Sequence, residues 1–186
     1  MNYILKTLTI VFLVLLNSCS DKDEKKIILD QTNLELQMIK AYKQGVEALE
    51  EGDVLYAATN FKMAQNLFPQ SDWAAKSNIM AAYAYYSQDY YGDAISELEQ
   101  FIKTYPKNKY EAYAYYLIAL CHYERIVDEK KDLKPLIKSK EYFESLVEMY
   151  PNTDFAIDAK FKIALIENIM ASKEIYIGKY YLKKEK

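Results

Sequence analysis

The side chains best suited to chemistry in this chain are a neighbouring thiol and imidazole, Cys121 and His122. A cysteine nucleophile needs a base within hydrogen-bonding distance. Both residues lie in an apolar run of helical character, where neighbours point about 100° apart and do not face each other. A lone histidine also excludes a metal site built on a histidine pair, and the four glycines form no phosphate-binding loop. The sequence predicts a buried structural thiol, no metal, no cofactor and no enzyme.

The other cysteine, Cys19, ends a segment with the pattern of a secretory signal peptide. Lys6 precedes a continuous apolar run over residues 8–16. A charged start, an apolar stretch of about 7–15 residues and small residues before the cut describe such peptides. This stretch is too short to span a bilayer core of about 30 Å comfortably. Leu16-Asn17-Ser18-Cys19 resembles the bacterial lipobox, which implies a signal peptide over 1–18 and acylation of Cys19 as the new N-terminus.

Acylation predicts a membrane-anchored protein outside the cytoplasm, because two or more acyl chains anchor stably. The best-known rule for retention in the inner membrane places Asp directly after the cysteine, and Ser20 stands there instead. We therefore expect the outer membrane, on its periplasmic face. Residues 19–32 are polar and mixed in charge, which predicts a flexible tether. The remaining chain carries 23 basic and 27 acidic residues, which argues against a nucleic-acid partner.

Beyond the tether, three prolines that each follow an aromatic residue mark an internal repeat. Phe68-Pro69, Tyr105-Pro106 and Tyr150-Pro151 are spaced by 37 and 45 residues. Five classes of position align on these prolines. They are Ser71, Asn108 and Thr153 (two after), Trp73, Tyr110 and Phe155 (four after), Ala82, Ala119 and Ala164 (thirteen after), Phe61, Leu98 and Phe143 (eight before), and Ala57, Ala94 and Ser139 (twelve before).

This repeat predicts an all-α fold of tetratricopeptide-like helical hairpins, stacked as a right-handed solenoid of about three and a half repeats over residues 33–186. Small residues let two helices approach, large ones fill the neighbouring gap, and proline ends a hairpin. The residues two after each proline are predicted N-caps. A charged run over 128–134 predicts a longer loop. The expected helix pairs are 33–51 with 54–68, 72–88 with 90–104, and 108–128 with 135–149, followed by a last apolar helix over 154–180.

Several stretches resemble the BamD/ComL family, the lipoprotein subunits of the machine that inserts β-barrels into the outer membrane. The resemblance covers about 36–181, and relatives usually carry five repeats, so the chain is expected to end about one and a half repeats early. The matching stretches are Ala82-Tyr83-Ala84-Tyr85-Tyr86, Asp89-Tyr90, Phe101-Ile102, Tyr115-Tyr116, Leu146-Val147, Tyr150-Pro151-Asn152-Thr153, and 173–181.

The resemblance implies a scaffold that binds the barrel subunit (of BamA type), other lipoproteins of the machinery and unfolded outer-membrane proteins, whose signal segments end in aromatic residues. Tyrosine is frequent, 19 of 186 residues, and supplies rigid contact area with a hydroxyl group. Tyrosines on the strongest apolar stripes (Tyr83, Tyr116 and Tyr150) are expected between helices. The candidates for a partner groove are Tyr86, Tyr90, Tyr113 and Tyr123, together with Asn60 and Asn78, for which a solvated helix face is the alternative.

Two other functions remain open at this stage. A generic repeat lipoprotein could organise peptidoglycan synthesis or envelope constriction, but a coiled coil would be expected before its repeats, and residues 20–32 are too short for one. A lipid-anchored component of an outer-membrane carbohydrate uptake system would have a larger, more irregular helical domain. The regular repeat spacing argues against the second.

Overall fold

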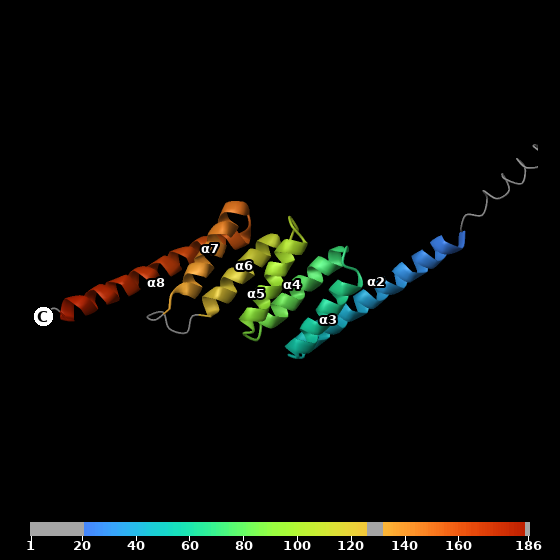
Figure 1. Ribbon diagram of the computed structural model, residues 1–186, viewed down its shortest axis with the longest axis horizontal. Coiled ribbons are helices and arrows are strands. Elements are labelled where there is room, and N and C mark those ends of the chain that lie inside the picture. The colour runs from blue at the N-terminus through green and yellow to red at the C-terminus, as the bar shows by residue number, and fades with distance from the viewer. Residues whose placement is uncertain (1–20, 126–131, 185–186) are drawn as a thin grey trace, which may run out of the picture.

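A computed structural model describes residues 21–125 and 132–184, with side chains from residue 32 onward. The predicted signal peptide, Cys19 and most of the predicted loop at 128–134 lie outside these residues. The described part folds into seven helices (Figure 1). They are α2 (Asp21–Glu50), α3 (Val54–Leu67), α4 (Asp72–Tyr86), α5 (Tyr91–Thr104), α6 (Glu111–Glu124), α7 (Lys134–Met149) and α8 (Asp154–Lys184).

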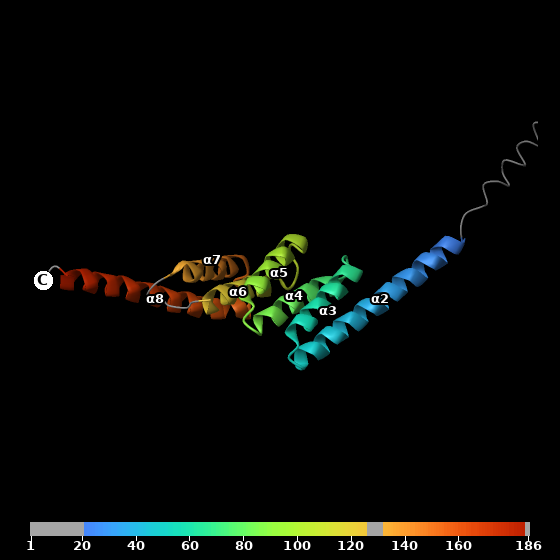
Figure 2. The same cartoon turned by 60° about the horizontal axis from the view of Figure 1, so that its bottom comes forward.

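The helices form consecutive hairpins, α2 with α3, α4 with α5 and α6 with α7, and each packs against the next along the chain. Helix α8 continues the row and also packs on α6. Figure 2 shows α2 and α8 at the two ends of this stack, each extending past its neighbour. The prediction of an all-α helical repeat is confirmed. Within the described residues, no helix is long and apolar enough to cross a membrane.

The predicted tether is the main difference in the fold. Helix α2 begins at Asp21 rather than near residue 33, so residues 21–32 are helical and not an irregular leash. The segment contains neither glycine nor proline, and its lysines, glutamate and leucine are good helix formers. Three acidic residues within the first four positions also suit the positive end of the helix dipole. The polar composition was compatible with either state, and helix propensity decided between them.

The repeat classes define the core as predicted. The large residues Phe61, Leu98 and Phe143 are fully buried, and the small residues that align with them are buried too. Ser139 ties two of the classes together, since its hydroxyl donates to the Ala119 carbonyl at 2.8 Å. Ala164 departs from its class and is exposed, because no described helix packs on that face of α8.

Helices α2 and α3 are in close contact at a glycine. A Cβ atom on Gly45 would lie 2.8 Å from both Cδ1 and Cε1 of Phe61. The position is helical and has no unusual backbone angle. Gly45 is therefore needed for its missing side chain rather than for conformational freedom.

Two of the three predicted N-caps are confirmed. The hydroxyls of Ser71 and Thr153 accept from the amides of Ala74 at 3.1 Å and Ala156 at 3.2 Å. The prediction for Asn108 is wrong. Its side chain accepts from the amide of Tyr110, at the position that itself caps α6, and so makes a turn before the helix.

Replacing Ser71 with alanine is expected to lower the free energy of unfolding by about 1 kcal/mol. The substitution removes the cap of α4 and the hydrogen bond that the hydroxyl donates to the Phe68 carbonyl at 2.8 Å. Urea unfolding followed by circular dichroism measures the change. Ser145→Ala is the control, because that hydroxyl only bonds back to its own helix at the Glu141 carbonyl. Equal effects of the two substitutions would contradict the cap.

Candidate functional site

A groove of about 520 Å³ opens between α4, α6 and α8. We call it the aromatic groove. Its walls come from α4, from the start of α6 and from the first turn of α8. The lining residues are Ile79, Met80, Tyr83, Lys109, Tyr110, Tyr113 and Phe155.

The wall on α4 is one helical stripe. Trp73, Lys76, Met80 and Tyr83 are spaced by three and four residues, which places them on one face of the helix. Tyr83 remains 40 % exposed within the stack. The stripe therefore presents side chains to solvent along the side of α4 that faces the groove.

The opposite wall is a set of packed rings. The Tyr113 ring lies 5.4 Å and the Tyr116 ring 5.3 Å from the ring of Phe155. The Tyr116 hydroxyl donates to Asp158 at 2.7 Å, which fixes α6 to α8 beside the groove. Rigid aromatic surface of this kind suits a large apolar or aromatic side chain of a partner.

The groove has little polar character apart from one cation. The ammonium of Lys109 lies 5.1 Å from the centre of the Tyr110 ring. Burial, with smaller effects of Tyr83 and Tyr86, raises the pKa of Tyr113 to about 12, so this wall residue is neutral at physiological pH. Lys109 is the only lysine, arginine or acidic residue among those that line the groove. The groove thus combines an apolar floor with a positive rim.

A second aromatic contact continues the same face toward α2. The ammonium of Lys76 lies 5.1 Å from the ring centres of both Tyr42 and Trp73. Those two rings pack edge to face, with their centres 5.1 Å apart. Two groups of aromatic rings, one between α2 and α4 and one between α6 and α8, therefore each hold a lysine ammonium.

Of the six predicted groove residues, only Tyr113 lies in the aromatic groove. Tyr86 is half-buried and packs against Tyr91, with ring centres 5.9 Å apart. Tyr90 is 44 % exposed but stands in the turn before α5. Tyr123 is half-buried below the ammonium of Lys162, at 5.4 Å.

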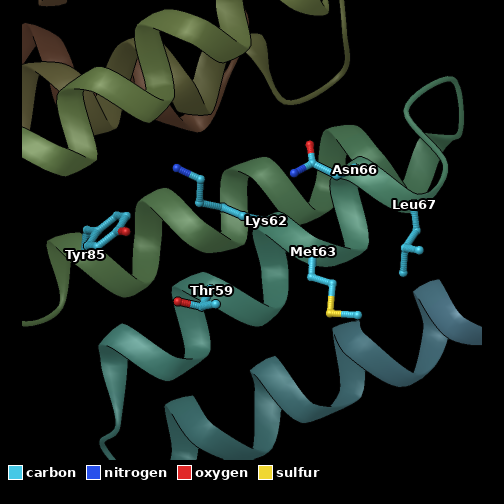
Figure 3. Close-up of a pocket in the computed structure, with 6 residues that line it drawn as sticks. All are labelled: Thr59, Lys62, Met63, Asn66, Leu67 and Tyr85. Atoms are coloured by element: carbon cyan, nitrogen blue, oxygen red, sulfur yellow. The ribbon is translucent and has the colours of Figure 1, made fainter.

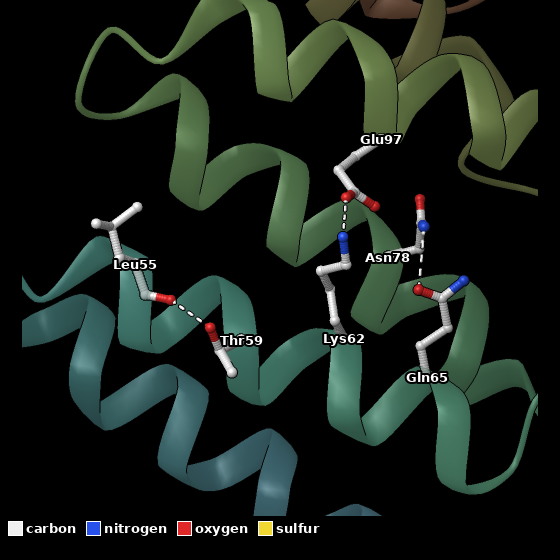
Figure 4. Close-up of polar contacts among 6 residues, drawn as sticks. All are labelled: Leu55, Thr59, Lys62, Gln65, Asn78 and Glu97. Carbon is white, nitrogen blue, oxygen red and sulfur yellow. Dashed lines mark hydrogen bonds and ion pairs between the residues drawn. The ribbon is translucent and has the colours of Figure 1, made fainter.

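The predictions for the two asparagines are wrong. Asn60 is 6 % exposed, and its amide donates to the Tyr56 carbonyl of its own helix at 2.9 Å. Asn78 is fully buried, and its amide donates to Gln65 at 3.1 Å (Figure 4). Neither side chain can reach a peptide, and neither lies on a solvated face. Both were polar residues in amphipathic helices, and only the packing of α3 on α4 distinguishes burial from exposure.

The sequence carried a signal for the groove residues that the prediction missed. Tyr110 and Phe155 are the aromatic residues four positions after their prolines, and both line the groove. Tyr83 was expected between helices but is half-exposed in the wall. Tyr116 and Tyr150 do lie half-buried between helices, as predicted. The aromatic repeat class four positions after each proline was thus the better guide to the groove.

A second hollow of about 570 Å³ lies along α3 and is lined by Thr59, Lys62, Met63, Asn66, Leu67 and Tyr85 (Figure 3). The lysine in this hollow already has a partner within the protein, because Lys62 pairs with Glu97 of α5 (Figure 4). That hydrogen bond raises the pKa of the lysine. The Thr59 hydroxyl donates to the Leu55 carbonyl at 2.8 Å. These groups are satisfied within the protein, so the aromatic groove is the stronger candidate.

The thiol of Cys121 is fully buried, as predicted. Burial raises its pKa to about 12, so the thiol stays protonated at neutral pH. The His122 ring stacks on Tyr142 with centres 5.7 Å apart, and burial lowers the pKa of the imidazole. Among the described residues, no group of three or more histidine, cysteine and acidic side chains could hold a metal ion.

Comparison with known proteins gives a consistent result. The model of the YfiO family, described as outer membrane lipoprotein, matches residues 34–186. The chain is 34 % identical over 166 residues to an outer membrane protein assembly factor BamD from Caulobacter vibrioides, covering 89 % of this chain and 53 % of the relative. A BamD from Rickettsia prowazekii is 34 % identical over 182 residues, covering 98 % and 70 %. The chain therefore spans about half of the first relative's length and 70 % of the second's.

Solved structures resemble the chain in fold alone. The first tetratricopeptide domain of human RPAP3 aligns with a TM-score of 0.56 at 17 % identity, over 75 % of this chain and 97 % of that one. The tetratricopeptide domain of Arabidopsis OM64 aligns with a TM-score of 0.54 at 14 % identity, over 70 % and 97 %. The stacked hairpins are thus of the tetratricopeptide kind.

Proposed function

The chain belongs to the YfiO family of outer membrane lipoproteins, and from this membership we propose that it is a lipid-anchored periplasmic scaffold of the machinery that assembles β-barrel proteins in the outer membrane. Its curated relatives are named outer membrane protein assembly factors. The alternative, a generic repeat lipoprotein that organises the cell envelope, has the same fold but lacks this support. The family match over most of the chain is the reason for preferring the first.

The proposed anchor is an acyl group on Cys19. The support is the lipobox-like segment Leu16-Asn17-Ser18-Cys19 and the description of the family. With Ser20 rather than Asp after the cysteine, we place the mature protein on the periplasmic face of the outer membrane. Several acyl chains give stable anchoring, and the part of α2 that extends past α3 then separates the membrane from the stack.

The proposed partners are the barrel subunit, the other lipoproteins of the machinery, and unfolded barrel proteins. The aromatic groove is the observation that supports the binding of unfolded barrel proteins. A stack of hairpins presents a surface on which an extended segment can lie, and the rings of Tyr83, Tyr113 and Phe155 offer a site for an aromatic side chain. The proposed role is binding, and the thiol of Cys121 is not available as a nucleophile because it is buried and protonated.

Gentle solubilisation of native membranes, capture of the lipoprotein by a C-terminal tag and identification of the co-purifying proteins tests the proposal. We expect an outer-membrane barrel with periplasmic repeat domains in stable amounts. Recovery of peptidoglycan enzymes or constriction proteins instead would refute the assembly role and favour the generic scaffold.

The contribution of the groove is tested in the same capture. Tyr83→Ala is expected to reduce the recovery of unfolded barrel precursors while the barrel subunit is retained. Tyr56→Ala is the matched control, because this tyrosine is 52 % exposed on α3 and does not line the groove.

A further inference from the structure

The aromatic groove lies next to two lysines whose charge the protein leaves unbalanced. Lys76 precedes Met80 by one turn on the face of α4 that lines the groove, and Lys109 belongs to the opposite wall. Within residues 32–125 and 132–184, neither lysine forms an ion pair, although Asp72 stands one turn before Lys76.

Three lysines elsewhere in the stack pair with carboxylates. Lys62 pairs with Glu97 of α5, Lys138 with Glu141 of its own helix at 2.6 Å, and Lys140 with Glu167 of α8 at 2.8 Å. None of the three lines the aromatic groove. Lys76 and Lys109 instead contact aromatic rings, which leave their charge unneutralised within the described residues.

Aromatic rings hold these two ammonium groups in place without neutralising them. Lys76 lies over the rings of Tyr42 and Trp73, and Lys109 lies over the ring of Tyr110, each at 5.1 Å from the ring centre. A cation over a ring face is attracted by the ring quadrupole, yet its three N–H donors can still bind a carboxylate. The side chains are therefore partly ordered before a partner arrives, which reduces the entropy lost on binding.

One carboxylate of the opposite wall is already bound within the protein. Asp158 accepts the hydroxyl of Tyr116 at 2.7 Å and so faces α6 rather than the rim. The surface around the groove thus offers an apolar site for one large side chain with a positive charge on either side. This pattern is complementary to an aromatic residue with acidic neighbours.

We infer that the aromatic groove binds an extended acidic peptide segment, with one aromatic side chain inserted between α4, α6 and α8 and aspartate or glutamate side chains of neighbouring residues bound by Lys76 and Lys109. This inference rests on the proposed function, because it specifies the chemistry of the partner segment. The rings supply the apolar contact, and the two lysines select for negative charge.

The test uses the full chain in detergent and a fluorescein-labelled peptide, acetylated and amidated at its ends, in which one phenylalanine is flanked by aspartate and glutamate. Fluorescence anisotropy measures its affinity. Two companion peptides replace the acidic residues by asparagine and glutamine, or the phenylalanine by alanine. We expect both companions to bind more weakly, and we expect the affinity of the acidic peptide to fall with added salt, because exposed charges are screened.

The double variant Lys76→Gln, Lys109→Gln is expected to bind the acidic peptide about three- to tenfold more weakly, since exposed ion pairs contribute up to about 1 kcal/mol each and about 1.4 kcal/mol is tenfold. Its affinity should also depend less on salt. The matched control is Lys103→Gln, Lys160→Gln, which removes two exposed charges that do not line the groove. Tyr83→Ala should weaken binding but keep the salt dependence. Circular dichroism verifies that every variant is folded.

Two results would overturn the inference. They are equal affinity of the two lysine double variants for the acidic peptide, or equal affinity of the wild type for the acidic and amide peptides. Neither of these concerns co-purification with the barrel subunit, so the proposed function could stand while this inference fails. Conversely, acidic-peptide binding without recovery of the machinery would leave the groove chemistry intact and remove the proposed function.

Discussion

Gly45→Ala is expected to lower the free energy of unfolding by about 1–3 kcal/mol, the range for forcing an extra methyl group into a packed core. The new Cβ would lie 2.8 Å from two carbons of the Phe61 ring. That ring is fully buried and packs edge to face on Tyr42, with centres 5.4 Å apart. The ring can move away only by disturbing the contact between α2 and α3, so the clash outweighs the better helix propensity of alanine.

The chain supplies a matched control in Gly178→Ala. Gly178 is helical and exposed in α8, and no atom lies within 4 Å of a Cβ placed there. Only helix propensity differs between glycine and alanine at this exposed position, so the variant should be more stable by about 0.5–1 kcal/mol. Urea unfolding measures the free energy of unfolding of both variants, and an unchanged m-value shows that the difference is one of stability. The double variant Gly45→Ala, Phe61→Leu should recover part of the loss by making room. A Gly45→Ala variant as stable as Gly178→Ala would show that α2 and α3 are not in such close contact.

The hairpins could be predicted because their signals are local and repeat at fixed spacing. Helix α5 was expected over 90–104 and spans Tyr91–Thr104, and α7 was expected over 135–149 and spans Lys134–Met149. Proline and cap residues mark the ends of such helices in the sequence itself. Buried positions followed for the same reason, since Phe61, Leu98 and Phe143 repeat at one distance from each proline.

The α4 wall of the aromatic groove could not be predicted in the same way. Tyr83 and Tyr86 stand three residues apart on α4, and only the first lines the groove. Which of the two faces the groove depends on how α6 packs against the preceding hairpin, and helical periodicity does not contain that information. The same limit applied to Asn78, whose burial depends on Gln65 of α3 as a hydrogen-bond partner. In each case, contacts between hairpins determine whether the side chain is buried or faces the groove.

Phe143→Ala is expected to lower the free energy of unfolding by about 3–5 kcal/mol, the usual cost of truncating a buried phenylalanine. The ring of Phe143 is fully buried in α7 and lies 5.9 Å from the ring of Tyr116 in α6. It belongs to the cluster that includes Leu136, Leu146 and Ile166 and joins α6, α7 and α8. The cavity would therefore weaken the last hairpin and its contact with α8.

Urea unfolding measures the loss, with Phe161→Ala as control, because Phe161 is 71 % exposed on α8 and its removal should change stability by less than about 0.5 kcal/mol. Stacked repeats contact only their neighbours, so hydrogen exchange should accelerate in α6, α7 and α8 and change little in α3. Peptide binding should weaken as well, because Phe155 forms the α8 wall of the groove. A uniform loss of protection over all helices would show instead that the stack unfolds as one cooperative unit and that the groove wall does not depend on the last hairpin alone.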